Sequence, residues 1–171
     1  MAQPHAAGRG VAECGTKTPM PQQYKTARCI LYRDDQFLLA IHNSFWRAAD
    51  RRWGLPGGQI EWREPPHVAA IRELDEELGV KVSGLLEIGA FSYKHARHMV
   101  YAAPFAGEIS NYDDAELIEI GWFDEPRIAD LKRQRRLHAD YELEAVQTLR
   151  SLLQLGSEPA NNLMSARRAR S

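Results

Sequence analysis

The chain is predicted to adopt an α+β fold, in which a mixed β-sheet packs between helices as an α/β/α sandwich. Three observations support this fold class. Short runs rich in β-branched and aromatic residues recur between residues 25 and 123 and are typical of strands. Residues 66–78 and 136–155 instead carry apolar residues at helical spacing. The order strand, strand, helix, strands, helix suits a single domain whose helices cover the sheet.

The first two strands are predicted at residues 25–32 and 37–42, joined by a short polar turn into a hairpin. A short strand is expected at 53–56. Later strands are expected at 81–93, 99–106 and 120–123. Because Pro104 lacks a backbone N–H, the strand that contains it is expected at a sheet edge or at a bulge.

The helix predicted at 66–78 has clear start and stop signals. Pro65 and Pro66 stand at its start, where a missing N–H is tolerated. Gly79 follows its last turn, where a left-handed cap is expected. The whole chain is predicted to consist of a flexible N-terminal arm at 1–24, a folded domain at 25–155 and a flexible basic tail at 156–171.

Three carboxylates are crowded onto one face of this helix. Glu73, Glu76 and Glu77 lie three and four residues apart and therefore share a face. Like charges at this spacing repel by roughly 0.2–0.5 kcal/mol per pair, so stability alone would not favour them. A bound Mg²⁺ would remove the repulsion, because hard divalent cations bind carboxylate oxygens. The alternative is a solvated acidic face without an ion.

The spacing of fixed residues around this helix is highly specific. Gly58 is followed by five residues, Glu64, seven residues and the run Arg-Glu-Leu-Asp-Glu-Glu-Leu-Gly-Val that ends at Val80. This segment resembles the signature of the Nudix hydrolases, and every fixed position is filled. The resemblance implies a Nudix-type α/β/α sandwich that binds Mg²⁺ or Mn²⁺ and hydrolyses a nucleoside diphosphate linked to another group. Family members often carry glycine where this chain has Arg63, so the loop's turn and local charge are expected to differ.

The resemblance also implies roles for individual residues. The implied metal ligands are the backbone carbonyl of Gly58, the carboxylates of Glu73, Glu76 and Glu77, and one further carboxylate from residues 111–119, with Glu116 as first choice and Glu119 as the alternative. Arg72 and Glu64 are implied to form an ion pair that holds the loop against the helix. Glu76 or Glu73 is expected to accept a proton from the attacking water.

Basic residues in two connections are candidates for binding substrate phosphates. Arg47, Arg51 and Arg52 follow the second strand, where relatives often carry a single arginine at the strand's end. His95 and Arg97 precede the strand at 99–106. Arginine forks match phosphate geometry, and histidine titrates near neutral pH. The alternative for each is a solvated surface side chain.

Composition limits the classes of partner. The formal net charge is −1, so no overall field attracts nucleic acid or an anionic membrane, and neither is expected as a partner. No apolar run reaches the roughly 20 residues that span a bilayer, and no signal peptide is expected. Cys14 and Cys29 are too few for a disulfide framework, which favours a cytoplasmic protein. A homodimer is reasonable because family members often pair.

The expected substrate is a nucleotide-type small molecule, with a nucleoside triphosphate as first choice. ADP-ribose hydrolases of the family often carry a proline shortly after the motif, and here His95 occupies that region. Dinucleoside polyphosphate hydrolases often carry a tyrosine after the motif, and neither Tyr93 nor Tyr101 has the usual spacing. These two substrate classes, nucleotide sugars and RNA 5′ ends stay alternatives. A non-catalytic Nudix domain that senses a nucleotide is an alternative of another class.

Overall fold

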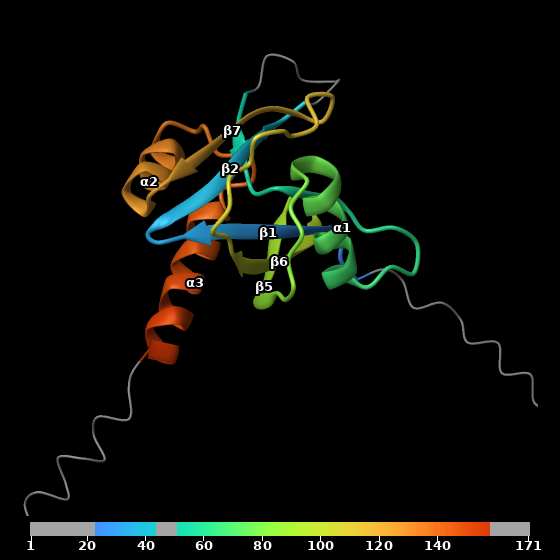
Figure 1. Cartoon of the computed structure of the whole chain (residues 1–171). Coiled ribbons are helices and arrows are strands. Elements are labelled where there is room, and N and C mark those ends of the chain that lie inside the picture. The colour runs from blue at the N-terminus through green and yellow to red at the C-terminus, as the bar shows by residue number, and fades with distance from the viewer. Residues whose placement is uncertain (1–22, 44–50, 158–171) are drawn as a thin grey trace, which may run out of the picture.

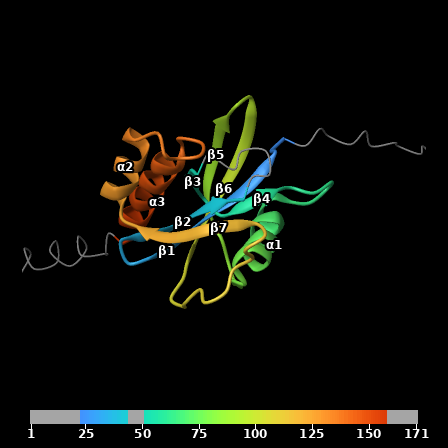
Figure 2. The same cartoon turned by 90° about the horizontal axis from the view of Figure 1, so that it is seen from above.

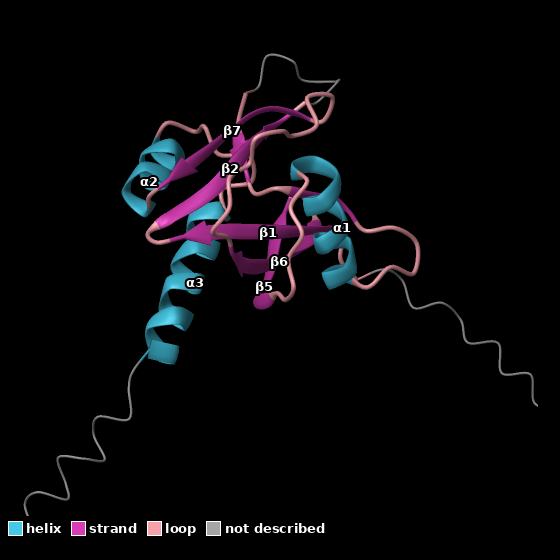
Figure 3. Ribbon diagram, viewed as in Figure 1, coloured by secondary structure: helices cyan, strands magenta, loops and turns pink. Residues whose placement is uncertain are grey.

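The computed structural model describes residues 23–43 and 51–157 of the chain. A sheet lies between α1 (Pro66–Leu78) on one face and α2 (Glu125–Arg133) and α3 (Glu142–Ser157) on the other (Figures 1 and 3). This arrangement confirms the predicted α+β sandwich. The predicted arm and tail fall almost entirely outside the described residues and stay predictions.

The sheet is mixed and has seven strands. They are β1 (Thr26–Arg33), β2 (Gln36–His42), β3 (Trp53–Gly54), β4 (Gly57–Gln59), β5 (Leu86–Tyr93), β6 (Ala96–Pro104) and β7 (Leu117–Phe123). β6 runs parallel to β1 along one side, and β5 pairs with β6 in a hairpin. On its other side β1 pairs with β4 at its start and with β2 at its end. β4 is thereby held beside the central strand.

Each face of the sheet has its own hydrophobic core, because side chains alternate along the strands. On β1, Ala27, Cys29 and Leu31 pack on the α1 side together with Leu74 of the helix. Ile30 points the other way and joins the core that contains the buried residues of α2 and α3. Figure 2 shows the helices on opposite sides of the sheet. A strand buried on both faces explains why residues 29–32 form an apolar run without alternation.

The structure agrees closely with the predicted central helix. α1 spans Pro66–Leu78, as the sequence predicts, and has a proline in its first turn. Gly79 adopts the left-handed conformation, with φ of 63°, and its N–H donates to the carbonyl of Asp75. Local chemistry alone specifies these ends, which is why they were predictable.

The C-terminal helices differ from the prediction. α2 was not predicted; it begins after Asp124, whose side chain accepts a hydrogen bond from the N–H of Arg127. Only Ile128 and Leu131 of this short helix are buried, so its apolar period is weak. α3 begins at Glu142 instead of residue 136, because the preceding segment bonds to Trp53 of β3 through the Trp53 N–H and carbonyl.

The expectation for Pro104 was wrong. The strand β6 is interior, paired with β1 on one side and β5 on the other. Pro104 is its last residue, and the pairing of β5 with β6 stops at Ala102, so β5 does not need the missing N–H. The irregular register lies instead in β5, between Glu87 and Gly89.

Candidate active site

Two glutamates of α1 are fixed against the backbone of β4. The carboxylate of Glu77 is buried, and its Oε2 accepts a 2.7 Å hydrogen bond from the N–H of Gly57. Glu73, one turn earlier, is 8% exposed and lies against Gly58. A Cβ atom at Gly58 would stand 2.3 Å from Oε2 of Glu73, so only glycine permits this approach. The Gly-Gly pair therefore sets the position of both carboxylates.

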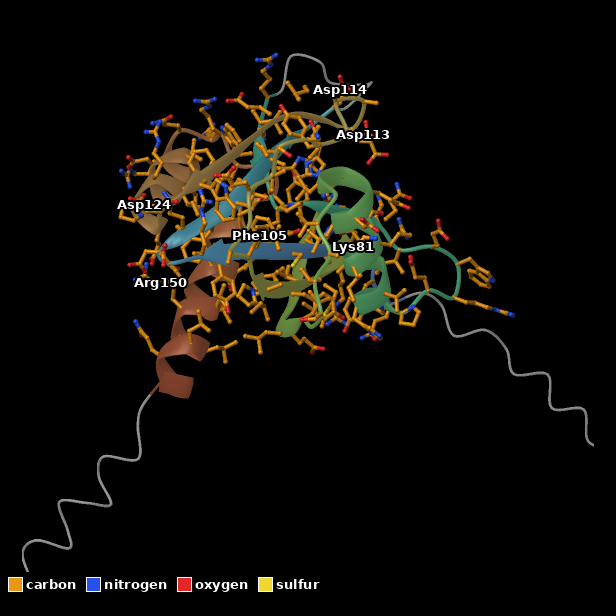
Figure 4. All side chains as sticks on the ribbon, in the orientation of Figure 1. Lys81, Phe105, Asp113, Asp114, Asp124 and Arg150 are labelled. Carbon is orange, nitrogen blue, oxygen red and sulfur yellow. The ribbon has the colours of Figure 1, made fainter. Side chains whose placement is uncertain are left out.

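A third carboxylate arrives from the connection before β7. The N–H of Asp113 donates to the carbonyl of Glu77, which attaches this connection to the end of α1 (Figure 4). The carbonyl of Glu116 accepts from the N–H of Asn43, at the end of β2. As a result, carboxylate oxygens of Glu73, Glu77 and Glu116 lie within 4.8 Å of one another. An all-oxygen donor set of this kind fits Mg²⁺ or Mn²⁺.

Arg72 organises the neighbouring carboxylates. Its Nε and Nη2 donate to the two oxygens of Glu64 at 2.9 and 3.0 Å, in the fork geometry of a bidentate pair. Its Nη1 donates to Glu73 at 2.9 Å and to Glu76 at 2.8 Å, and its Nη2 also donates to the carbonyl of Gln59. These bonds join the loop, the end of β4 and α1. The guanidinium of Arg72 holds the pKa of Glu64 below its usual range.

The structure does not bring Glu76 into the group of three carboxylates. The side chain of Glu76 is 55% exposed and is bonded to Arg72, one turn earlier on the helix. Burial raises the pKa of Glu73, and the negative charges of Glu77 and Glu76 act in the same direction against the effect of Arg72. The two residues implied as proton acceptors therefore occupy different surroundings, one nearly buried and one open to water.

In the loop after the motif glycines, Arg63 stands where family members often carry glycine. Arg63 has φ of 64°, in the left-handed region where glycine carries no steric penalty. The loop is nevertheless closed by hydrogen bonds between Glu61 and Glu64, one in each direction. The arginine therefore occupies the turn at some conformational cost.

The five basic residues predicted to bind substrate do not all gather at one place. Arg47 lies outside the described residues. Arg51 is exposed and Arg52 is half-buried, just before β3. His95 belongs to the turn of the β5–β6 hairpin, where it has φ of 64°, and Arg97 follows at the start of β6.

Sequence reasoning missed Arg28, although a lone charge within an apolar strand was a signal. Its Nη1 donates to the carbonyls of Leu55 and Gly57 and lies 3.1 Å from Nε2 of His42. The same Nε2 atom of His42 lies 3.1 Å from Oε1 of Glu77. Arg28 and His42 therefore connect β1 and β2 to Glu77, one of the three grouped carboxylates.

Sequence reasoning also missed a cluster of rings on the α3 side of the sheet. Tyr93 lies 6.2 Å from His98 and 5.7 Å from His138, and His98 lies 5.7 Å from Tyr141, measured between ring centroids. Partial desolvation of the ring lowers the pKa of His138 to about 4. The positive charges of Arg28, His42, Lys94 and Arg52 act in the same direction. The ammonium of Lys94 lies over the ring of Tyr93, 4.8 Å from its centroid, so a basic side chain borders this cluster.

Comparisons with known proteins agree with this geometry. The family profile described as NUDIX domain matches residues 23–143. Human diphosphoinositol polyphosphate phosphohydrolase 2 is 33% identical over 144 residues, which cover 80% of this chain and 74% of that protein. Human diphosphoinositol polyphosphate phosphohydrolase 3-alpha is 33% identical over 159 residues, covering 85% of this chain and 88% of the other.

Solved structures show the same fold. A MutT NUDIX hydrolase from Burkholderia pseudomallei aligns with a TM-score of 0.53 at 26% identity, over 61% of this chain and 86% of that one. The NUDIX domain of Shewanella oneidensis NrtR, in complex with ADP ribose, aligns with a TM-score of 0.60 at 20% identity, over 81% and 94%. With the profile and the phosphohydrolase relatives, these findings establish that the chain belongs to the Nudix family and is a pyrophosphohydrolase.

Proposed function

We propose that the protein hydrolyses a pyrophosphate bond of a nucleoside triphosphate or a related nucleotide, with Mg²⁺ or Mn²⁺ held by Glu73, Glu77 and Glu116. The observation that carries the proposal is the convergence of these carboxylates within 4.8 Å, beside the glycines of β4. A divalent cation bound there would neutralise charge on phosphate oxygens and acidify a water molecule. Glu76 and the carbonyl of Gly58 stay candidate ligands.

The residues of the chain itself have distinct tasks in this proposal. Arg72 fixes the orientation of Glu73 and links the helix to Glu64 in the loop. Gly57 and His42 fix both oxygens of Glu77, which leaves little freedom for that buried carboxylate. Either Glu73 or Glu76 accepts the proton of the attacking water. Preorganised carboxylates of this kind lower the barrier because they need no rearrangement during the reaction.

A nucleotide is supported by the groups on the α3 side of the sheet. The rings of Tyr93 and His138 are open enough to offer stacking surfaces for a base, and the buried rings of His98 and Tyr141 pack beside them. The Nζ of Lys94 lies 4.8 Å from the centroid of the Tyr93 ring, so a basic side chain stands beside these rings, and Arg52 stays a candidate for binding a phosphate. Arg51 stays a candidate for the same role.

A second candidate substrate is a diphosphoinositol polyphosphate, which has no base and many phosphate groups. The two human relatives described above are named for action on such compounds. The basic residues at the tip of the β5–β6 hairpin favour a substrate of high negative charge. The nucleoside triphosphate stays the first choice because of the ring cluster.

The test is a substrate panel with matched glutamate variants. The full-length protein would be incubated with Mg²⁺ or Mn²⁺ and nucleoside triphosphates, ADP-ribose, NADH, nucleotide sugars, dinucleoside polyphosphates, triphosphorylated RNA or diphosphoinositol pentakisphosphate. Released phosphate and pyrophosphate would be measured for the wild type and for Glu73→Gln and Glu76→Gln. Turnover of one class that either variant loses supports the proposal. Tight nucleotide binding without turnover in either metal would favour a nucleotide-sensing domain and overturn it.

Two further expectations concern the whole protein. No helix in the described part of the chain is long and apolar enough to cross a membrane. A cytoplasmic location and a homodimer are our expectations, and neither rests on a contact between chains. Light scattering after size exclusion tests the dimer, and a single monomer mass across micromolar concentrations would contradict it. Cell fractionation tests the location.

A further inference from the structure

A second cationic region lies on the α1 side of the sheet, apart from the ring cluster. It is a cavity of about 570 Å³ between the start of β1, the end of β4 and the tip of the β5–β6 hairpin. We call it the hairpin pocket. Its lining includes Tyr24, Lys25, Gln59, Ile60, His95 and Arg97. The described residues that line it include no carboxylate, and Lys25 and Arg97 give it positive charge.

The cations of the hairpin pocket are available to a ligand. Lys25, His95 and Arg97 are all exposed. Within the described part of the chain, none of the three forms an ion pair with a carboxylate. The guanidinium of Arg97 instead rests over the ring of Tyr24, 5.0 Å from its centroid. The ammonium of Lys25 and the guanidinium of Arg97 favour an anionic ligand, since each can form charge-assisted hydrogen bonds.

Backbone hydrogen bonds hold the walls of the pocket together. The N–H of Lys25 donates to the carbonyl of Arg97 at 2.8 Å, and the N–H of Ile60 donates to the carbonyl of Lys25 at 3.2 Å. The hairpin turns through Lys94 and His95, both with positive φ. Three separate segments are therefore attached to one another around the cavity, and two of them carry its cations.

The pocket adjoins the candidate metal centre through β4. Gln59 lines the pocket, and the preceding residue, Gly58, lies against the carboxylate of Glu73. Gly58 and Gln59 are consecutive in β4, with Cα atoms about 3.8 Å apart, so the two regions adjoin at this strand. The carbonyl of Gln59 also accepts a hydrogen bond from Arg72. A ligand with several phosphate groups can therefore contact both regions.

We propose that the hairpin pocket binds a phosphate group of the substrate that is remote from the cleaved bond. This inference rests on the proposed function and specifies its substrate class: compounds with more phosphate groups than the two that flank the cleaved bond. Adenosine tetraphosphate and diphosphoinositol pentakisphosphate have such additional phosphates. ADP-ribose has only the two phosphates of the cleaved bond and serves as the matched short substrate.

The experiment compares the double variant Lys25→Ala/Arg97→Ala with Arg127→Ala/Lys132→Ala, which removes the same charge from exposed positions on α2. We expect KM for adenosine tetraphosphate to rise by about tenfold or more, as charge-assisted bonds are lost, with kcat nearly unchanged. KM for ADP-ribose should change less than about twofold, and added salt should reduce the difference between substrates. The α2 variant should match the wild type.

Lys25→Ala/His95→Ala keeps the Arg97–Tyr24 contact and repeats the test if the first variant misfolds.

Binding measurements keep this inference separate from the proposed function. Calorimetry with Ca²⁺ in place of Mg²⁺ would give the affinities for adenosine tetraphosphate and ADP-ribose without requiring turnover. Selective loss of tetraphosphate affinity in the variants supports the pocket even if no hydrolysis is found. Equal losses for both ligands, or losses matched by the α2 variant, overturn it. A loss of inorganic tripolyphosphate binding with both nucleotides unaffected would also overturn it, because the pocket would then serve a free anion.

Discussion

The two sides of the sheet differ in how their carboxylates are hydrogen-bonded. On the α1 side, Arg72 satisfies three carboxylates, and Glu77 is bonded to backbone and to His42. On the α3 side, Glu142 is buried at the start of α3 with only one oxygen bonded, to the N–H of Ala139. Its other oxygen, Oε2, has no partner among the described residues.

The carboxylates on the α1 side are fixed in position by hydrogen bonds, whereas the α3 side contains a buried carboxyl with few partners. The α1 side holds its carboxylates at defined positions through hydrogen bonds, as a metal centre requires. On the α3 side, burial raises the pKa of Glu142 to about 7. A carboxyl in those surroundings is stabilised by a proton instead of by an arginine. Changes on the α1 side should therefore affect turnover first, and a change at Glu142 should affect stability and its pH dependence.

The largest effect is expected for Glu77→Gln. The change removes a negative charge from the group of three carboxylates and weakens the acceptor of the Gly57 N–H. Metal catalysis is worth several kcal/mol, so kcat should fall by roughly a thousandfold. Steady-state kinetics in Mg²⁺ would measure it. Glu108→Gln, at an exposed carboxylate in the connection before β7, is the control and should retain activity. A Glu77→Gln rate within tenfold of wild type would show that turnover does not depend on this group of carboxylates.

Glu142→Gln tests the α3 side through pH. Because the folded pKa is raised, the stability due to this group is complete below its unfolded pKa of 4.5 and is lost as pH rises through about 7. The neutral variant avoids this loss. Between pH 5 and pH 8 the unfolding free energy of the variant should gain up to about 3 kcal/mol relative to wild type. Urea denaturation at both pH values measures it, with exposed Glu144→Gln as control. Parallel pH profiles would contradict the expectation.

Gly58→Ala tests how closely β4 must approach α1. The new Cβ would collide with the carboxylate of Glu73 and displace it. A displacement near 1 Å can reduce a rate by roughly a hundredfold, and we expect a loss of that order in kcat. Gly84→Ala is the matched control, since no atom lies within 4 Å of its Cβ position. Equal activity of the two variants would show that Glu73 has more freedom than the structure gives it.

Arg72→Lys keeps the positive charge at this position and removes the fork geometry of the guanidinium. Lysine cannot make the bidentate pair with Glu64 while also bonding to Glu73 and Glu76. We expect about a tenfold fall in kcat and about 1–2 kcal/mol of destabilisation, since the network is partly exposed. Kinetics and thermal unfolding measure the two effects. Arg127→Lys on α2 serves as the control, and a similar result there would rule out a special role for the fork.

The smallest effect is expected at Arg63. Its left-handed backbone costs a non-glycine residue about 1 kcal/mol, so Arg63→Gly should stabilise the protein by roughly 0.5–1 kcal/mol. Arg63→Ala removes the same side chain but keeps the Cβ atom, and it should give no such gain. Chemical denaturation separates the two variants. A larger gain from alanine than from glycine would mean that the side chain, not the backbone, determines the effect.

Much of the catalytic side was predictable because it is local in the chain. The helix bounds and the Gly79 cap follow from local residues, and the Arg72–Glu64 pair is the one that the resemblance to the Nudix signature implies. Spacing along a helix places side chains without reference to the rest of the molecule. The strands at 25–32 and 37–42 were predictable for the same reason, since their apolar runs and the turn between them are local signals.

The remaining features depend on contacts between distant segments. Glu116 is a candidate from the sequence, but only the bonds of its connection to α1 and β2 bring it to the other carboxylates. Tyr93, His98 and Tyr141 come from separate elements, and no spacing in the chain predicts that their rings meet. Strand pairing and burial decide such encounters, and both depend on the whole chain.

The sequence by itself therefore determined the family, the central helix and the acidic face that it presents to β4. Tertiary structure decided which carboxylates converge, that Glu76 stays bonded to Arg72, and that Arg28 and His42 support Glu77 from behind. It also decided where the cations of the hairpin pocket meet. The physical reason is range: helical periodicity and capping act over a few residues, whereas the sheet brings together groups that are far apart in the chain.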